Sequence, residues 1–209
     1  MEEFEFLSRY PANELVLGPV QRSEAIAIYG LIRSIRPKRV VEIGFGEGDS
    51  TEALLAATSG IPGATVTSYD IRVSWQHALL LTKKYAHLEV IQADQTSLDL
   101  GPDVVDFLFL DASHSIDQNK AFWRTNESRL GPGSYVVIHD TGLWADGWFD
   151  DASLANFGKR GSRRGVEGRF HQPGEVEFVE WLTENNGWTR VDIGSRNCFR
   201  HGFTILQRK

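Results

Sequence analysis

Residues 40–48, which read VVEIGFGEG, carry the strongest structural signal in the chain. The run from Val40 to Ile43 holds three β-branched side chains, as a buried parallel strand would. Alternating glycines follow at once, and Asp49 or Ser50 can then cap a helix. Glycines let the backbone turn tightly and approach a ligand, and a helix N-terminus presents free N–H groups. The stretch therefore predicts a strand, a ligand-binding turn and a helix.

On both sides of this stretch, segments with strand character alternate with segments of helical spacing. Helices are expected at residues 23–35, 49–57, 75–85, 115–130 and 174–184. Strands are expected at 40–43, 64–69, 88–91, 104–110 and 135–138, and 188–193 with 203–207 read as a closing antiparallel pair. This alternation predicts helices on both faces of a parallel sheet. We therefore expect one α/β domain over 1–209, Rossmann-like and doubly wound, with about seven mostly parallel strands and an antiparallel last strand.

Two segments fall outside this alternation, an N-terminal segment at 1–20 and an irregular segment at 141–172. The second follows the carboxyl end of a strand, where ligands bind in open parallel sheets, and long irregular insertions are usually functional. We expect it to be a lid over a small-molecule acceptor, which its basic residues could clamp if it is anionic. The alternative is that the aromatic side chains of this segment only anchor it to the body of the domain and that its charged side chains are solvated. The residues concerned are Trp144, Trp148, Phe149, Phe157 and Phe170, with Lys159, Arg160, Arg163, Arg164 and Arg169.

Composition excludes several classes of protein. The 209 residues are 41% hydrophobic, which suffices for one self-standing core. Cys198 is the only cysteine, which excludes an internal disulfide and a cysteine-rich zinc site and fits a reducing cytoplasm. No apolar run suggests a membrane span or a signal peptide. The net charge of −6 argues against nucleic acid as a substrate, because only the basic stretch at 159–169 would favour its binding. The sequence leaves open whether the protein forms a homo-oligomer.

Two kinds of nucleotide ligand compete for the glycine turn. The dinucleotide-binding pattern G-x-G-x-x-G needs a third glycine where this chain has Asp49. A carboxylate at the start of the helix would repel a diphosphate. The turn instead suits a cofactor that carries a positively charged amino group and a sulfonium.

The pattern E-x-G-x-G-x-G after a first strand resembles motif I of the class I S-adenosylmethionine-dependent methyltransferases, and the likeness extends from about Ser23 to the C-terminus. Asp70 matches that family's acidic residue for the ribose hydroxyls. Asp94 matches the position that often meets the adenine amino group, although an aspartate at a strand end is as often a cap. The resemblance implies S-adenosylmethionine as cofactor and the cofactor-binding residues Glu42, Gly44, Phe45, Gly46, Gly48, Ser50, Asp70, Asp94 and Asp111.

Two later strands are followed by acidic residues. Asp111 follows one strand, and His139 and then Asp140 follow the other. The carboxyl ends of neighbouring parallel strands meet at one edge, so Asp111 and Asp140 are expected to converge. Close carboxylates repel unless a cation lies between them or one keeps its proton. A divalent metal ion is the simplest remedy, and oxygen ligands suit magnesium.

The pattern D-x-x-H followed by an acidic strand end resembles metal-dependent O-methyltransferases that act on sugars and other natural products, with cephalosporin-hydroxylase-like relatives. The resemblance implies that Asp111 and Asp140 bind the metal and that His114 is the general base. That branch has an acidic residue where this chain has His139, and a catechol-type or caffeoyl-type alignment makes Thr141 the third position. A set of Asp111, His139 and Asp140 favours Mn²⁺ or Fe²⁺ over Mg²⁺, because imidazole is the softer donor.

The leading hypothesis is therefore O-methylation of a hydroxyl on a small molecule such as a glycoside or natural product, with His114, Asp111 and His139 as candidate catalytic residues. A metal lowers the pKa of the hydroxyl, and a histidine can take its proton at neutral pH. One alternative is a metal-independent N- or C-methyltransferase with His114 or His139 as base. Another is a methyltransferase fold that binds the cofactor without methyl transfer. In the blandest interpretation, His114 caps a helix and His139 packs beside the sheet.

Overall fold

A computed structural model describes residues 5–10, 20–113, 115–141, 174–184, 187–194 and 202–209. Its helices are α1 (Arg22–Ile35), α2 (Asp49–Thr58), α3 (Trp75–Lys84), α4 (Ile116–Asn126) and α6 (Gly174–Thr183). Short 3-10 turns lie at η1 (Glu5–Arg9), η2 (Gln95–Ser97) and η3 (Glu127–Arg129). The strands are β1 (Arg39–Ile43), β2 (Thr65–Asp70), β3 (Leu88–Gln92), β4 (Phe107–Leu110), β5 (Tyr135–His139), β6 (Trp188–Gly194) and β7 (Gly202–Arg208).

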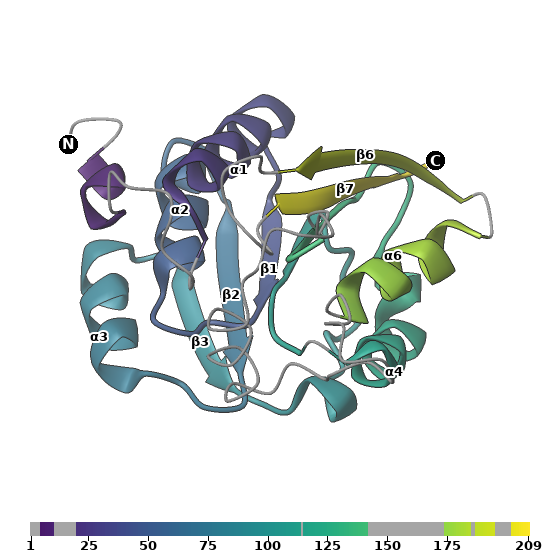
Figure 1. Cartoon of the computed structure of the whole chain (residues 1–209). Coiled ribbons are helices and arrows are strands. Elements are labelled where there is room, and N and C mark those ends of the chain that lie inside the picture. Colours follow the sequence, from purple (N-terminus) through teal and green to yellow (C-terminus); the bar gives the residue numbers. More distant parts are fainter. Residues whose placement is uncertain (1–4, 11–19, 114, 142–173, 185–186, 195–201) are drawn as a thin grey trace, which may run out of the picture.

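The described strands form one sheet in the order β3-β2-β1-β4-β5-β7-β6 (Figure 1). β1 pairs in parallel with β2 and β4, β2 with β3, and β4 with β5. β7 is antiparallel to both of its neighbours, β5 and β6. The predicted Rossmann-like α/β fold and the antiparallel closing pair are thus confirmed.

Helices cover both faces of the sheet. Successive residues of a strand point to opposite faces, so each central strand contributes side chains to two cores. Val40 faces a core shared with α1, α2 and α3, and Val41 faces a second core shared with α4 and α6. In the second core, Trp123 and Trp188 are buried and Trp181 is partly buried. Both faces of the central strands are therefore apolar, as a buried parallel sheet requires.

Most predicted boundaries are shifted by one residue, and three larger differences, one in a helix cap and two in element ends, have a visible cause. α2 begins after Gly48, which is its N-cap, because the Ser50 hydroxyl bonds Glu42 instead of capping the helix. β4 begins only at Phe107, because the N–H of Val105 donates to the Arg129 carbonyl and lies outside the strand ladder. α4 ends at residue 126 and continues as the 3-10 turn η3.

The segment expected to be a lid, 141–172, lies outside the described residues except for Thr141. The aromatic and basic residues assigned to it are likewise not described. Among the residues that are, none belongs to a helix long and apolar enough to pass through a membrane.

Candidate active site

Four parallel strands bring the predicted site residues to one edge of the sheet. Ile43 of β1 is in register with Tyr69 of β2 and Leu110 of β4, and Leu110 is in register with Ile138 of β5. The residues that follow these positions therefore come together at the carboxyl edge, where open parallel sheets bind ligands.

Gly44 packs directly against the main chain of Asp111. Its N–H donates to the Tyr69 carbonyl at 2.8 Å, and the Asp111 N–H donates to the Ile43 carbonyl at 2.8 Å. A Cβ at Gly44 would lie 2.0 Å from the Asp111 carbonyl oxygen, and the residue has φ +108°. Only glycine fits such a contact. The predicted cofactor turn and the acidic end of β4 are thus adjacent.

Asp70 is held against the same turn. One carboxylate oxygen accepts the N–H of Gly46 at 2.9 Å, and the other accepts the N–H of Arg72 at 2.8 Å. A Cβ at Gly46 would meet no atom of the described residues within 4 Å, so these residues leave the turn open on that side. The structure therefore brings Asp70 to the glycine turn, and the contact of Asp70 with a ribose stays a prediction.

Glu42 lies under the turn and is fully buried. Its carboxylate accepts hydrogen bonds from Ser50 at 2.6 Å, from Thr51 at 2.5 Å and from Ser68. Burial raises the pKa of Glu42 to about 7, although the three hydroxyls lower it, and the charge of Asp111 adds to the rise. Glu42 therefore links β1, β2 and α2 through these hydrogen bonds. Contacts of Glu42 and Ser50 with a cofactor stay predictions.

The raised pKa of Glu42 makes stability depend on pH. The folded chain holds the proton more tightly than the unfolded chain, so the free energy of unfolding falls as pH rises from about 4.5 to about 7. The loss attributable to this group is about 3 kcal/mol. In Glu42→Gln that decline is expected to be shallower, as measured by urea unfolding at pH 5, 6, 7 and 8. A decline as steep as that of the wild type would contradict this role.

Phe45 and Asp94 occupy different surroundings. Phe45 is buried in the core on the α2 side, where its ring lies below Gly48. Asp94 caps η2, because its carboxylate accepts the N–H and the hydroxyl of Thr96, both at 2.8 Å, and these bonds lower its pKa. Asp94 is therefore observed as a cap. Contacts of Phe45 and Asp94 with a cofactor stay predictions.

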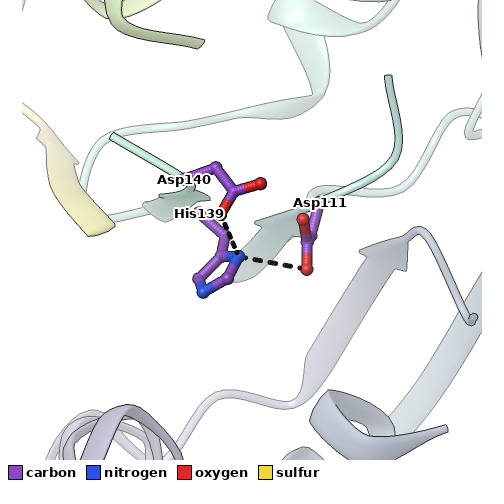
Figure 2. Close-up of side chains that lie close together, drawn as sticks. All are labelled: Asp111, His139 and Asp140. Carbon is purple, nitrogen blue, oxygen red and sulfur yellow. Dashed lines mark ion pairs between the residues drawn. The ribbon is translucent and has the colours of Figure 1, made fainter. Parts of the chain in front are cut away.

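Asp111, His139 and Asp140 form a cluster in which one ligand atom from each lies within 4.8 Å of the others. The Nδ1 atom of His139 is 3.2 Å from an oxygen of Asp111 and 3.4 Å from an oxygen of Asp140 (Figure 2). Asp111 is about one-fifth exposed, whereas the side chains of His139 and Asp140 are buried. The expected convergence of Asp111 and Asp140 is thus observed.

The backbone at Asp140 explains how two consecutive residues reach one point. Neighbouring residues of a regular strand face opposite sides of the sheet. Asp140 has φ +60°, a left-handed conformation that aspartate tolerates better than most residues. The turn after β5 therefore directs Asp140 toward the ring of His139 and the carboxylate of Asp111.

Glu24 of α1 contacts the other side of the ring, and no sequence argument pointed to it. Its Oε2 atom is 3.1 Å from Nε2 of His139. Glu24 lies four residues before Ile28 and eight before Ile32, so helical spacing places it on the apolar face of α1. A charged residue on a buried helix face was the signal that could have found it.

The charges around His139 decide its protonation. Burial lowers the pKa of this imidazole, but the carboxylates of Asp111, Glu24 and Asp140 together raise it well above its ordinary value. A protonated ring can neither accept a proton nor bind a metal ion, so without a metal this environment favours a charge-balancing role for His139 over that of a general base at neutral pH. The other predicted base, His114, lies outside the described residues.

Thr141, the alternative third ligand, is engaged elsewhere. Its hydroxyl accepts a hydrogen bond from the Thr204 hydroxyl of β7 at 3.0 Å. It is also 3.5 Å from the Ile138 carbonyl. This arrangement favours His139 over Thr141 as the third member of the cluster.

Comparison with known proteins identifies the domain. Residues 41–141, which hold the glycine turn and the Asp111, His139 and Asp140 cluster, match the model of a methyltransferase domain family. The chain contains a methyltransferase domain. The resemblance to methyltransferases indicated by the glycine motif is thereby confirmed. Comparison with curated proteins gives no significant match.

Solved structures share the fold of this methyltransferase domain at low sequence identity. The methyltransferase of Podospora anserina bound to SAH is 17% identical, with a TM-score of 0.66 over 100% of this chain and 86% of that one. The O-methyltransferase of Bacillus cereus bound to SAH is 17% identical, with a TM-score of 0.64 over 99% and 90%. The O-methyltransferase TomG of Streptomyces achromogenes, involved in tomaymycin synthesis and bound to SAM, is 18% identical, with a TM-score of 0.62 over 98% and 90%.

Proposed function

We propose that this methyltransferase domain uses S-adenosylmethionine to methylate a hydroxyl group of a small molecule, with a divalent metal ion held by Asp111, His139 and Asp140. The main-chain contact between Gly44 and Asp111 carries the proposal, because it makes the glycine turn and the acidic cluster neighbours. Methyl transfer needs the acceptor oxygen in line with the sulfonium, and holding two reactants in that geometry supplies much of the rate. The SAM- and SAH-bound O-methyltransferases of the same fold support this assignment.

The residues around the glycine turn suit a positively charged cofactor. Asp70 has two lone-pair sites left after its bonds to the Gly46 and Arg72 N–H groups, and these can accept ribose hydroxyls. Among the described residues, no atom fills the space beside Gly46 on its side of the turn. Asp49 opens α2 with a carboxylate, which disfavours a diphosphate at this helix end.

The cluster fits a metal ion in donor type and in its surroundings. Two carboxylates and one imidazole provide three ligand atoms within 4.8 Å of one another. Metal-binding histidines usually donate their other N–H to a carboxylate, and Glu24 lies at Nε2 of His139 in that position. A bound divalent ion would lower the pKa of the acceptor hydroxyl. The imidazole ligand favours Mn²⁺ or Fe²⁺ over Mg²⁺.

A second candidate function is a metal-independent N- or C-methyltransferase. The observation that favours it is the raised pKa of His139, because an imidazolium can itself balance the charges of Asp111, Glu24 and Asp140. In that case the cluster stabilises the sheet edge and contributes no metal chemistry.

Chelation separates the two candidates. Incubation with EDTA is expected to abolish methyl transfer to phenolic and glycoside acceptors, and Mn²⁺ is expected to restore it better than Mg²⁺. Formation of S-adenosylhomocysteine, measured by mass spectrometry, reports turnover. Full activity in chelator would favour the second candidate. Tight cofactor binding without consumption of S-adenosylmethionine on any acceptor would instead indicate a protein that binds the cofactor without methyl transfer.

A further inference from the structure

Glu24 joins three parts of the fold at one buried carboxylate. Its side chain is 5% exposed and lies in the first turn of α1. Oε1 accepts the N–H of Gly202 at the start of β7 at 2.5 Å, and Oε2 accepts the N–H of Gln21 at 2.7 Å. Oε2 also lies 3.1 Å from Nε2 of His139. Glu24 is therefore fixed by α1 and β7 while it contacts the end of β5.

This contact decides which nitrogen of His139 faces the cluster. A carboxylate only accepts hydrogen bonds, so Nε2 must carry the hydrogen that points to Glu24. Nδ1 then lies toward Asp111 and Asp140, at 3.2 and 3.4 Å from their nearest oxygens. In the neutral ring with hydrogen on Nε2, Nδ1 presents a lone pair to the point where the two carboxylates converge.

We propose that Glu24 is a positioning residue that holds His139 with Nδ1 toward Asp111 and Asp140, and so makes this nitrogen a ligand of the metal site. The inference rests on the proposed metal-dependent function. Glu24 itself lies on the far side of the ring from the two aspartates and acts through the imidazole. Such outer carboxylates orient a metal-binding ring and raise its basicity.

A structural role for Glu24 is the competing explanation. Its bonds to Gln21 and Gly202 alone would fix the start of α1 against β7, whatever His139 does. The decisive measurement must therefore read the ring nitrogen and not only stability or turnover.

Glu24→Gln keeps the size of the side chain and changes its hydrogen bonding. An amide cannot offer acceptors to the Gly202 N–H, the Gln21 N–H and Nε2 of His139 at once, since one of its two polar ends only donates. With its NH₂ toward the ring, it favours hydrogen on Nδ1, which blocks that nitrogen as a ligand. We expect Mn²⁺ affinity, followed by electron paramagnetic resonance of the full chain, to fall about tenfold to a hundredfold.

Pulsed resonance of the Mn²⁺-loaded protein reads the ligand directly. With ¹⁵N-labelled histidine, the wild type is expected to show a hyperfine coupling from a directly bound imidazole nitrogen, which disappears in His139→Asn. Glu24→Gln is expected to lose the same coupling. Glu52→Gln is the matched control, because Glu52 is equally buried but pairs with Lys84, so it should keep both coupling and affinity.

Each outcome decides the proposal. If Glu24→Gln keeps the wild-type Mn²⁺ affinity and hyperfine coupling, the positioning role of Glu24 is overturned. The same holds if the wild type binds Mn²⁺ without any imidazole coupling, although the proposed metal dependence would remain. A wild type that binds no Mn²⁺ would overturn both, while calorimetry with S-adenosylhomocysteine tests the cofactor assignment separately. If Glu24→Gln does not fold, Glu24→Asp shortens the arm to Nε2, and unchanged affinity and coupling in that variant would overturn the proposal.

Discussion

Replacement of Asp111 by asparagine is expected to lower methyl transfer by roughly a hundredfold or more. The change keeps the shape of the side chain but removes the charge 3.2 Å from Nδ1 of His139 and one of the proposed metal ligands. Metal-assisted charge stabilisation is worth several kcal/mol, and each 1.36 kcal/mol is tenfold in rate, so about two to four orders of magnitude depend on an intact site. Initial rates of S-adenosylhomocysteine formation, with Mn²⁺ added, measure the loss.

The same variant should keep its cofactor affinity, and the cofactor contact that the resemblance assigns to Asp111 would then involve its main chain and not its carboxylate. Gly44 meets the main chain of Asp111, not its carboxylate, so the glycine turn is unaffected by the substitution. Calorimetry with S-adenosylhomocysteine should therefore give a dissociation constant close to that of the wild type. Asp99→Asn, which removes the charge of an exposed carboxylate outside the cluster, is the control for lost charge alone. Unreduced turnover in Asp111→Asn would remove this residue from the chemistry.

Gly44→Ala is expected to lower the free energy of unfolding by roughly 3–5 kcal/mol, from overpacking and backbone strain together. The new Cβ would lie 2.0 Å from a carbonyl oxygen of the neighbouring main chain, and neither atom belongs to a flexible side chain. The strand ends must separate to admit it, so binding of S-adenosylhomocysteine should be lost as well. Urea unfolding and calorimetry on the same preparation measure the two effects.

Gly63→Ala is the matched control for this substitution. Gly63 also has a positive φ, +72°, but a Cβ there would meet no atom within 4 Å in the part of the chain that the structure describes. It should lose only the 1–2 kcal/mol or so of a left-handed residue and keep its cofactor affinity. Equal stability of the two alanine variants would show that the contact between Gly44 and Asp111 is not the constraint we infer.

The fold was predictable because each buried strand is a short apolar run that ends in a turn signal. Val40 to Ile43 followed by glycines placed β1, and the same logic placed β5 at residues 135–138, one residue short of its observed end at His139. The meeting of Asp111 and Asp140 was predictable for a topological reason, since neighbouring parallel strands end at one edge. Sequence order and strand direction were enough for both.

The remaining contacts depend on tertiary packing between segments far apart in the chain. Glu24 reaches His139 across 115 positions, and Ser68 reaches Glu42 across 26. Serine and threonine occur throughout protein sequences, so nothing in the sequence marks Thr51 and Ser68. Their role as hydrogen-bond donors to the buried carboxylate of Glu42 appears only in the folded structure. Helix caps were mistaken for a similar reason, because the Ser50 hydroxyl had a stronger partner in Glu42 than the helix end.

The left-handed turn at Asp140 restricts which side chains evolution or protein design could install at the end of β5. At φ +60° a residue other than glycine pays a conformational penalty, which asparagine and aspartate bear most easily. A neutral amide or a bare glycine could thus replace this carboxylate without moving the backbone. A β-branched residue would strain the turn, and a longer carboxylate such as glutamate would carry a conformational cost of about 1–2 kcal/mol, so changes of donor chemistry at this position are restricted to a few residue types.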